Sequence, residues 1–67
     1  MKTKTELLQM LYSRLAEVQH YQNEDTDMVG TSTYETVLTE LNLLNEILGD
    51  DVPEEYWEQI EDAIYYC

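Results

Sequence analysis

The clearest helical pattern in the chain runs from Ser32 to Leu48, STYETVLTELNLLNEIL. Its apolar residues recur at steps of three and four, the spacing that places side chains on one face of an α-helix. They are Tyr34, Val37, Leu38, Leu41, Leu44, Ile47 and Leu48. Ser32 and Glu35 match a capping box, which satisfies backbone N–H groups of the first turn, and Gly49 follows where helices often turn left-handed. The pattern therefore predicts an amphipathic helix over Ser32–Leu48.

A second helical pattern precedes it, from about Lys4 to Gln22. Thr3 and Glu6 can form another capping box at its start. Its apolar stripe consists of Leu8, Leu11, Leu15 and Val18, widened by Leu7 and Tyr12. The connection of roughly residues 23–31 is short, so packing the two stripes against each other predicts an antiparallel helical hairpin.

A third helix is expected from Pro53 to about Tyr66. Proline is well tolerated in a first helical turn, and Asp51, three residues before Glu54, can cap the helix. The apolar stripe of this segment is Trp57, Ile60, Ile64 and Cys67, widened by Tyr56 and Ala63. The sequence thus predicts an all-α three-helix unit, a helical hairpin plus an acidic C-terminal helix, forming one domain over residues 1–67.

With 67 residues, the chain is short for a stable core. Chains of this length bury only about 60% of the surface that they expose when unfolded, and they commonly depend on disulfides, metals or association. One cysteine cannot form an internal disulfide, and one cysteine with one histidine cannot supply a zinc site. Association remains, so we expect a homodimer.

Charge is the most unusual property of the sequence. Fifteen Asp and Glu residues stand against three basic residues, and the formal net charge is −12. The bases are Lys2, Lys4 and Arg14, and no Lys or Arg follows them. Phosphate contacts need such side chains, so the composition argues against direct binding of nucleic acid or an anionic membrane and favours basic partners. Because we find neither an apolar signal-peptide region nor a run of about 18 apolar residues, we expect a cytoplasmic protein.

Catalytic signatures are not found in this sequence. The only glycines, Gly30 and Gly49, cannot form a phosphate-binding loop, and no Ser-His-acid or Cys-His arrangement can be assembled. His20, the one imidazole, is expected on the surface near a helix end, and Cys67 lacks a fixed neighbour that would activate it as a nucleophile. We therefore expect a non-enzymatic protein without a cofactor.

The acidic connection between the first two helices partly matches an EF-hand calcium loop. With Asp25 at position 1, Asp27 falls at position 3 and Gly30 at position 6, as the motif requires. Position 5 is Val29, and position 12 is Thr36 where a glutamate is needed, so two key ligands are missing. We interpret this connection as a solvated acidic loop without a metal site.

An acidic face is predicted on the third helix, because its carboxylates recur at three- and four-residue steps opposite the apolar stripe. These residues are Glu54, Glu55, Glu58, Glu61 and Asp62. Each step advances about 5–6 Å along the axis, close to the separation of successive phosphates in a nucleic-acid strand. Together with three carboxylates upstream, this acidic face forms a larger acidic patch. The three upstream residues are Glu46, Asp50 and Asp51. Unpaired like charges at i,i+4 destabilise a helix, so the face is either merely solvated or is neutralised by a basic protein on binding.

Residues 46–67, together with the net charge of −12 on a small helical fold, resemble the DNA-mimic proteins of bacteriophages. Such proteins present carboxylates where DNA presents phosphates, and they include small acidic host-takeover proteins of SPO1-like Bacillus phages that inhibit the nucleoid protein HU. The resemblance implies a stoichiometric, dimeric inhibitor in the cytoplasm of an infected bacterium. It also implies that the eight carboxylates within residues 46–62 bind a basic, DNA-binding host protein such as HU.

Two other functions are compatible with the sequence. One is an adaptor, antitoxin or anti-defence protein that binds a protein partner through an apolar helical surface, with tyrosines as anchors. The candidate anchors are Tyr12, Tyr21, Tyr65 and Tyr66. The other is a sponge for a nucleotide messenger, which is disfavoured because only three basic residues could meet the phosphates. Salt dependence separates a mimic from an apolar binder, because only charge attraction weakens steeply with ionic strength.

Overall fold

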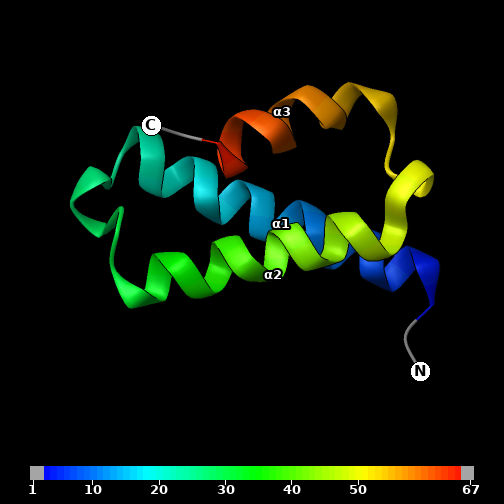
Figure 1. Cartoon of the computed structure of the whole chain (residues 1–67), viewed down its shortest axis with the longest axis horizontal. Helices are drawn as coiled ribbons and strands as arrows, with labels where there is room; N and C mark the ends of the chain where they lie inside the picture. Colours follow the sequence, from blue (N-terminus) through cyan, green and yellow to red (C-terminus); the bar gives the residue numbers. More distant parts are fainter. Residues whose placement is uncertain (1–2, 66–67) are drawn as a thin grey trace.

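Three α-helices joined by two short 3-10 turns make up the computed structural model, which describes residues 3–65. The elements in chain order are α1 (Lys4–Asn23), η1 (Thr26–Met28), α2 (Ser32–Leu48), η2 (Gly49–Asp51) and α3 (Glu54–Ile64). α1 and α2 form an antiparallel hairpin, and α3 runs back along this hairpin in the direction opposite to α2 (Figure 1). The predicted all-α three-helix unit is confirmed.

Threonine hydroxyls cap the first turns of both long helices. The Oγ1 of Thr3 accepts a hydrogen bond from the backbone N–H of Glu6, with an N–O distance of 3.2 Å, as predicted for α1. The prediction that Ser32 caps α2 is wrong, because Thr31 is the N-cap. The Oγ1 of Thr31 accepts a hydrogen bond from the backbone N–H of Tyr34, with an N–O distance of 3.3 Å. The reason is the backbone, because an N-cap residue needs an extended conformation, which Thr31 has with φ −77° and ψ 162°. Ser32 is already helical.

The corner between α2 and α3 begins at Gly49 and ends at Pro53. Gly49 has a φ of +52°, the left-handed backbone that glycine adopts without steric cost, so the predicted end of α2 is confirmed. The predicted cap of α3 is wrong, because Pro53 is the N-cap and no side chain bonds the first turn. Asp51 belongs to η2, and its carboxylate lies 3.3 Å from the Nζ of Lys4. The predicted end of this helix at about Tyr66, and Cys67 of its predicted apolar stripe, lie outside the described residues.

The core is built from side chains of all three helices and the corner. The buried residues are Leu11, Leu15, Val18, Tyr34, Leu41, Leu44, Leu48, Val52, Ile60 and Ala63. Val52 was not expected there, because it lies in the connection after η2, where no helical period could reveal it. It precedes the N-cap of α3, the position from which an apolar residue often packs against the fourth helical residue, here Trp57.

Two apolar residues that the sequence analysis placed in the core are exposed. The exposed fraction is 66% for Ile47 and 46% for Trp57. An α-helix turns about 100° per residue, so Ile47 lies about 120° around α2 from the buried Leu41. Trp57 lies about 120° around α3 from the buried Ala63, at the border between the buried side and the acidic face. Successive steps of three residues therefore carry both side chains off the buried face.

Polar and aromatic contacts hold α3 on the hairpin. The Nε2 of Gln22 donates to the hydroxyl oxygen of Tyr34 at 2.8 Å and to the backbone oxygen of Ala63 at 3.0 Å, which links all three helices. The rings of Tyr12 and Tyr56 lie with their centroids 4.7 Å apart, which joins α1 to α3. The acidic side of α3 is therefore held in a defined orientation and faces away from the hairpin. Within residues 3–65, no helix is long and apolar enough to cross a membrane.

Candidate acidic interface

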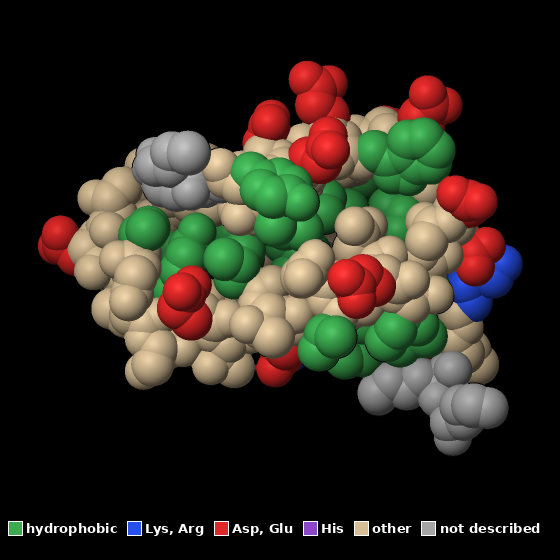
Figure 2. Space-filling model, in the orientation of Figure 1, with side chains coloured by type: hydrophobic (Ala, Val, Ile, Leu, Met, Phe, Trp, Pro, Cys, Tyr) green, Lys and Arg blue, Asp and Glu red, His purple; other side chains and the backbone are tan. Residues whose placement is uncertain are grey.

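The acidic face of α3 points into solvent along its whole length. All five of its carboxylate residues are exposed, whereas Ile60 and Ala63 on the opposite side are buried. At about 100° per residue, Glu54, Glu58 and Glu61 lie within roughly 60° of one another around the helix. Figure 2 shows acidic side chains projecting along the edge of the molecule that α3 forms in Figure 1. The predicted grouping of these residues on one side is present in the structure.

The three upstream carboxylates are also exposed, and one of them has a partner. Glu46 lies in the last turns of α2, and Asp50 and Asp51 lie in η2, next to the start of α3. The ion pair between Asp51 and Lys4 brings a cation from the other end of the sequence to this patch, which the sequence could not reveal. Both side chains are about half exposed or more, so water screens this pair and it contributes little to stability.

The cations described by the structure are occupied by carboxylates outside the acidic face. Arg14 bonds Glu40 of α2 through its Nε, and its Nη1 lies 3.5 Å from Glu17 in α1. Lys4 is paired with Asp51. Among residues 3–65, no Lys or Arg forms an ion pair with any of the five carboxylates of the acidic face. Within this described range, no Lys or Arg therefore offsets their mutual repulsion.

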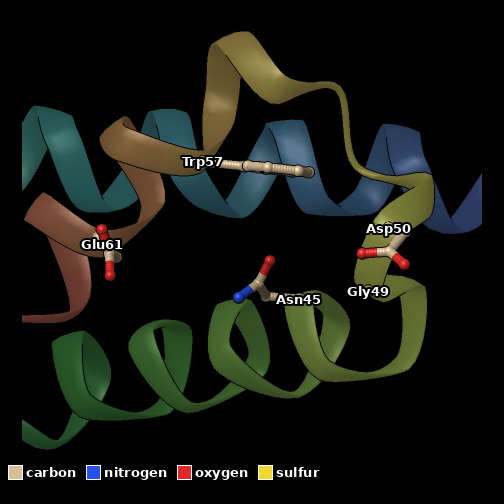
Figure 3. A pocket seen from close by; sticks show the side chains of 5 residues that line it. All are labelled: Asn45, Gly49, Asp50, Trp57 and Glu61. Atoms are coloured by element: carbon tan, nitrogen blue, oxygen red, sulfur yellow. The ribbon is translucent and has the colours of Figure 1, made fainter.

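A concave site adjoins the acidic face where α2, η2 and α3 meet. This tryptophan pocket has a volume of about 360 Å³ and is lined by Asn45, Gly49, Asp50, Trp57 and Glu61. Figure 3 shows the side chains of Asn45 and Glu61 pointing into the space between α2 and α3, with the indole on the α3 side. The sequence predicts Asp50 and Glu61 in the acidic patch, but it does not predict that they share a pocket with an exposed tryptophan.

Two of the four candidate tyrosine anchors are packing residues. Tyr12 is half-buried against Tyr56, and Tyr21 is half-buried with its ring centroid 6.1 Å from that of Tyr34. Tyr65 is exposed, and Tyr66 lies outside the described residues. A different apolar surface is available on the hairpin. There the exposed Leu43 and Ile47 of α2 lie beside Met10, Arg14, Glu40 and Leu44.

The single histidine and the acidic connection between α1 and α2 lie apart from the acidic face. His20 is exposed at the end of α1, and its Nδ1 lies 3.0 Å from the Oε2 of Glu24. Within residues 3–65, no three His, Cys, Asp or Glu side chains are arranged to hold a metal ion, including those of the acidic connection. A comparison with models of protein families, with curated proteins and with solved structures finds no significant match for this chain.

Proposed function

We propose that this protein is a non-enzymatic acidic inhibitor that occupies the DNA-binding surface of a basic host protein, such as the nucleoid protein HU. In this proposal it acts in the cytoplasm of an infected bacterium and presents carboxylates where DNA presents phosphates. One observation carries the proposal: five exposed carboxylates share one side of α3, and no described cation pairs with them.

The spacing of the acidic face supports this function. Successive carboxylates on the helix are separated by three or four residues, or about 5–6 Å of axial rise. Proteins that bind DNA place Lys and Arg along a surface that follows the phosphates of a strand. A rigid row of carboxylates at a comparable separation can be met by the same lysines and arginines. Binding of this kind is spread over many partly solvated contacts, so each single carboxylate is expected to contribute little.

The cost of the acidic face to folding also favours a basic partner. Like charges at i,i+4 destabilise a helix by about 0.2–0.5 kcal/mol per pair, and Glu54–Glu58 and Glu58–Asp62 are such pairs. Basic groups of a partner would neutralise this repulsion in the complex. The gain on binding would then be larger at low ionic strength, because dissolved salt screens exposed charges.

A second candidate function is favoured by the exposed apolar surface of the hairpin. Leu43 and Ile47 have exposed fractions of 51% and 66%, and Met10 of α1 lies beside them. Such a surface can receive an apolar helix of a partner, as an adaptor, antitoxin or anti-defence protein would require, or a second copy of this chain. Binding at this surface would be nearly insensitive to salt, which separates it from charge mimicry.

The proposed function is tested by capture from a bacterial lysate at low salt with three baits. The first is the wild type. The second, the α3-neutral variant, carries Gln at the five positions of the acidic face. The third, the control variant, removes the same number of charges elsewhere through Glu6→Gln, Glu24→Gln, Asp25→Asn, Asp27→Asn and Glu35→Gln. Removing five negative charges from −12 leaves both variants at −7, so only the location of the charge differs.

We expect the wild type and the control variant to capture the same DNA-binding protein, and the α3-neutral variant to lose it. Circular dichroism establishes that each bait is folded. If the folded α3-neutral variant captures that protein as well as the wild type does, the carboxylates of α3 serve only for solubility. A fourth bait, Leu43→Asp, tests the second candidate function, which is supported if this variant loses a partner whose capture is insensitive to salt.

A further inference from the structure

The tryptophan pocket combines an aromatic ring with oxygen acceptors at one end of the acidic patch. α2 contributes Asn45, η2 contributes Asp50, and α3 contributes Trp57 and Glu61. In Figure 3 the indole is seen edge-on, so one face of the ring is turned toward α2 and Asn45 across the pocket. The carboxylate of Glu61 and the amide of Asn45 approach the same space from opposite helices.

The orientation of the indole is fixed by a hydrogen bond. The Nε1 of Trp57 donates to the backbone oxygen of Val52 at 2.7 Å, which ties the ring to the corner before α3. Nε1–H is the only hydrogen-bond donor of a tryptophan side chain, so the indole has no further polar group to offer a ligand. The ring itself remains partly available, because 46% of the residue is exposed and the indole lines the pocket with one face toward α2 (Figure 3). This tryptophan is the only one in the sequence.

The residues that line the tryptophan pocket favour a cationic, hydrogen-bond-donating ligand. The face of an aromatic ring attracts cations, and tryptophan does so most strongly among the aromatic side chains. Two carboxylates and an amide oxygen accept hydrogen bonds, and the carboxylates add negative charge. A guanidinium fits this combination, because it is planar, stacks on aromatic rings and carries five N–H donors in a fork that matches a carboxylate. An ammonium group is a point charge and is more strongly hydrated, so it gains less from the ring.

We propose that the tryptophan pocket receives an arginine side chain of the basic partner, an inference that rests on the proposed function. The acidic face then supplies a diffuse attraction, and the pocket supplies one defined anchor beside it. Trp and Arg are the residues that most often dominate the binding energy of protein interfaces. The anchor would fix how the partner lies along α3, which a row of similar carboxylates cannot do alone.

The site is tested first without the partner, by NMR titration of the isotope-labelled protein with N-acetyl-arginine amide and N-acetyl-lysine amide. We expect the arginine compound to shift the indole N–H signal of Trp57 and the side-chain amide signal of Asn45 in a saturable manner. The lysine compound should bind about two- to fivefold more weakly, the range of a cation–π contact at an exposed site. Equal shifts with both compounds, or shifts that do not saturate, would overturn the proposal.

Variants distinguish the contribution of the pocket to binding from that of the surrounding negative charge. Asp50→Asn combined with Glu61→Gln should weaken binding of the arginine compound, whereas Glu54→Gln combined with Glu58→Gln removes the same charge outside the pocket and should change it little. Trp57→Leu should abolish the preference for arginine. Trp57→Phe keeps a ring face and should retain part of it, which guards against an effect of lost folding alone. Equal losses in both charge pairs would overturn the proposal.

The affinity of the captured partner for two variants then tests this inference separately from the proposed function. Trp57→Leu leaves every carboxylate of the acidic face in place, so a loss of affinity in the folded variant is not a loss of charge. If the α3-neutral variant loses the partner while a folded Trp57→Leu variant keeps full affinity, the proposed function stands and the arginine site is refuted. If the pocket binds the arginine compound selectively but no basic partner is captured at low salt, the proposed function fails and the arginine preference of the pocket stands.

Discussion

Truncation of Leu41 is the sharpest test of how the three helices pack. Leu41 lies in the middle of α2 and is completely buried, with an exposed fraction of 0%. Leu41→Ala removes buried methyl and methylene groups and leaves a cavity, which typically costs about 2–5 kcal/mol. Natural domains are stable by about 5–15 kcal/mol, and one of this size belongs at the low end. The substitution should therefore remove a third or more of the free energy of unfolding.

The assay is thermal unfolding followed by circular dichroism, with reductant present. A change of 1 kcal/mol shifts the melting temperature of a small domain by about 4–8 °C, so Leu41→Ala should lower it by at least about 8 °C or unfold the protein. Leu43→Ala is the matched control, because Leu43 is the same residue type in the same helix with an exposed fraction of 51%. Both variants are measured at the lowest practical protein concentration, where self-association contributes least. Similar melting temperatures for the two variants would refute the described packing of α2.

Three further predictions concern the assembly, the acidic face and the link between the helices. Sedimentation equilibrium at micromolar concentration should give a mass near twice the 7.9 kDa of one chain, and a wild-type mass of one chain would contradict dimerisation. If Leu43 and Ile47 form the contact between the two copies, Leu43→Asp should reduce the mass to that of one chain. The α3-neutral variant should melt at or above the wild-type temperature, because it loses like-charge repulsion without losing packing, and a clearly lower value would contradict this. Gln22→Leu should destabilise by about 1–3 kcal/mol in urea unfolding, because it removes two part-buried hydrogen bonds that each contribute about 0.5–1.5 kcal/mol. An unchanged midpoint would contradict the role of Gln22 in joining the helices.

Periodicity predicted the helices well because burial of one side of a helix repeats along the chain. The bounds of α2 agree with the expected Ser32–Leu48, and the buried Leu41, Leu44 and Leu48 follow its apolar spacing. Periodicity was less reliable at the edge of a face. Ile47 and Trp57 satisfy steps of three residues, yet the helical turn of about 100° per residue moves them out of the core.

Features outside the helices were harder to predict, because they depend on backbone conformation or on residues that are distant in the sequence. Thr31 and Ser32 are both good N-caps, and only the extended backbone of Thr31 decides between them. Val52 lies in a connection without a repeat, although its position before the N-cap, with Trp57 downstream, is a usable signal. For the candidate site, the sequence predicted which carboxylates share a side of α3. It could not predict that Lys4 reaches Asp51, or that Asn45 faces Trp57 across a pocket.

The central claim is that the carboxylates of α3 compete with DNA for one basic surface. It is tested most directly by the fluorescence anisotropy of a labelled DNA duplex bound to the captured host protein, titrated with the wild type, the α3-neutral variant and the control variant. We predict that the wild type and the control variant release the duplex, and that this release weakens steeply between about 50 and about 200 mM salt. The α3-neutral variant should leave the duplex bound. Release of the duplex by the folded α3-neutral variant at the wild-type concentration would contradict the claim.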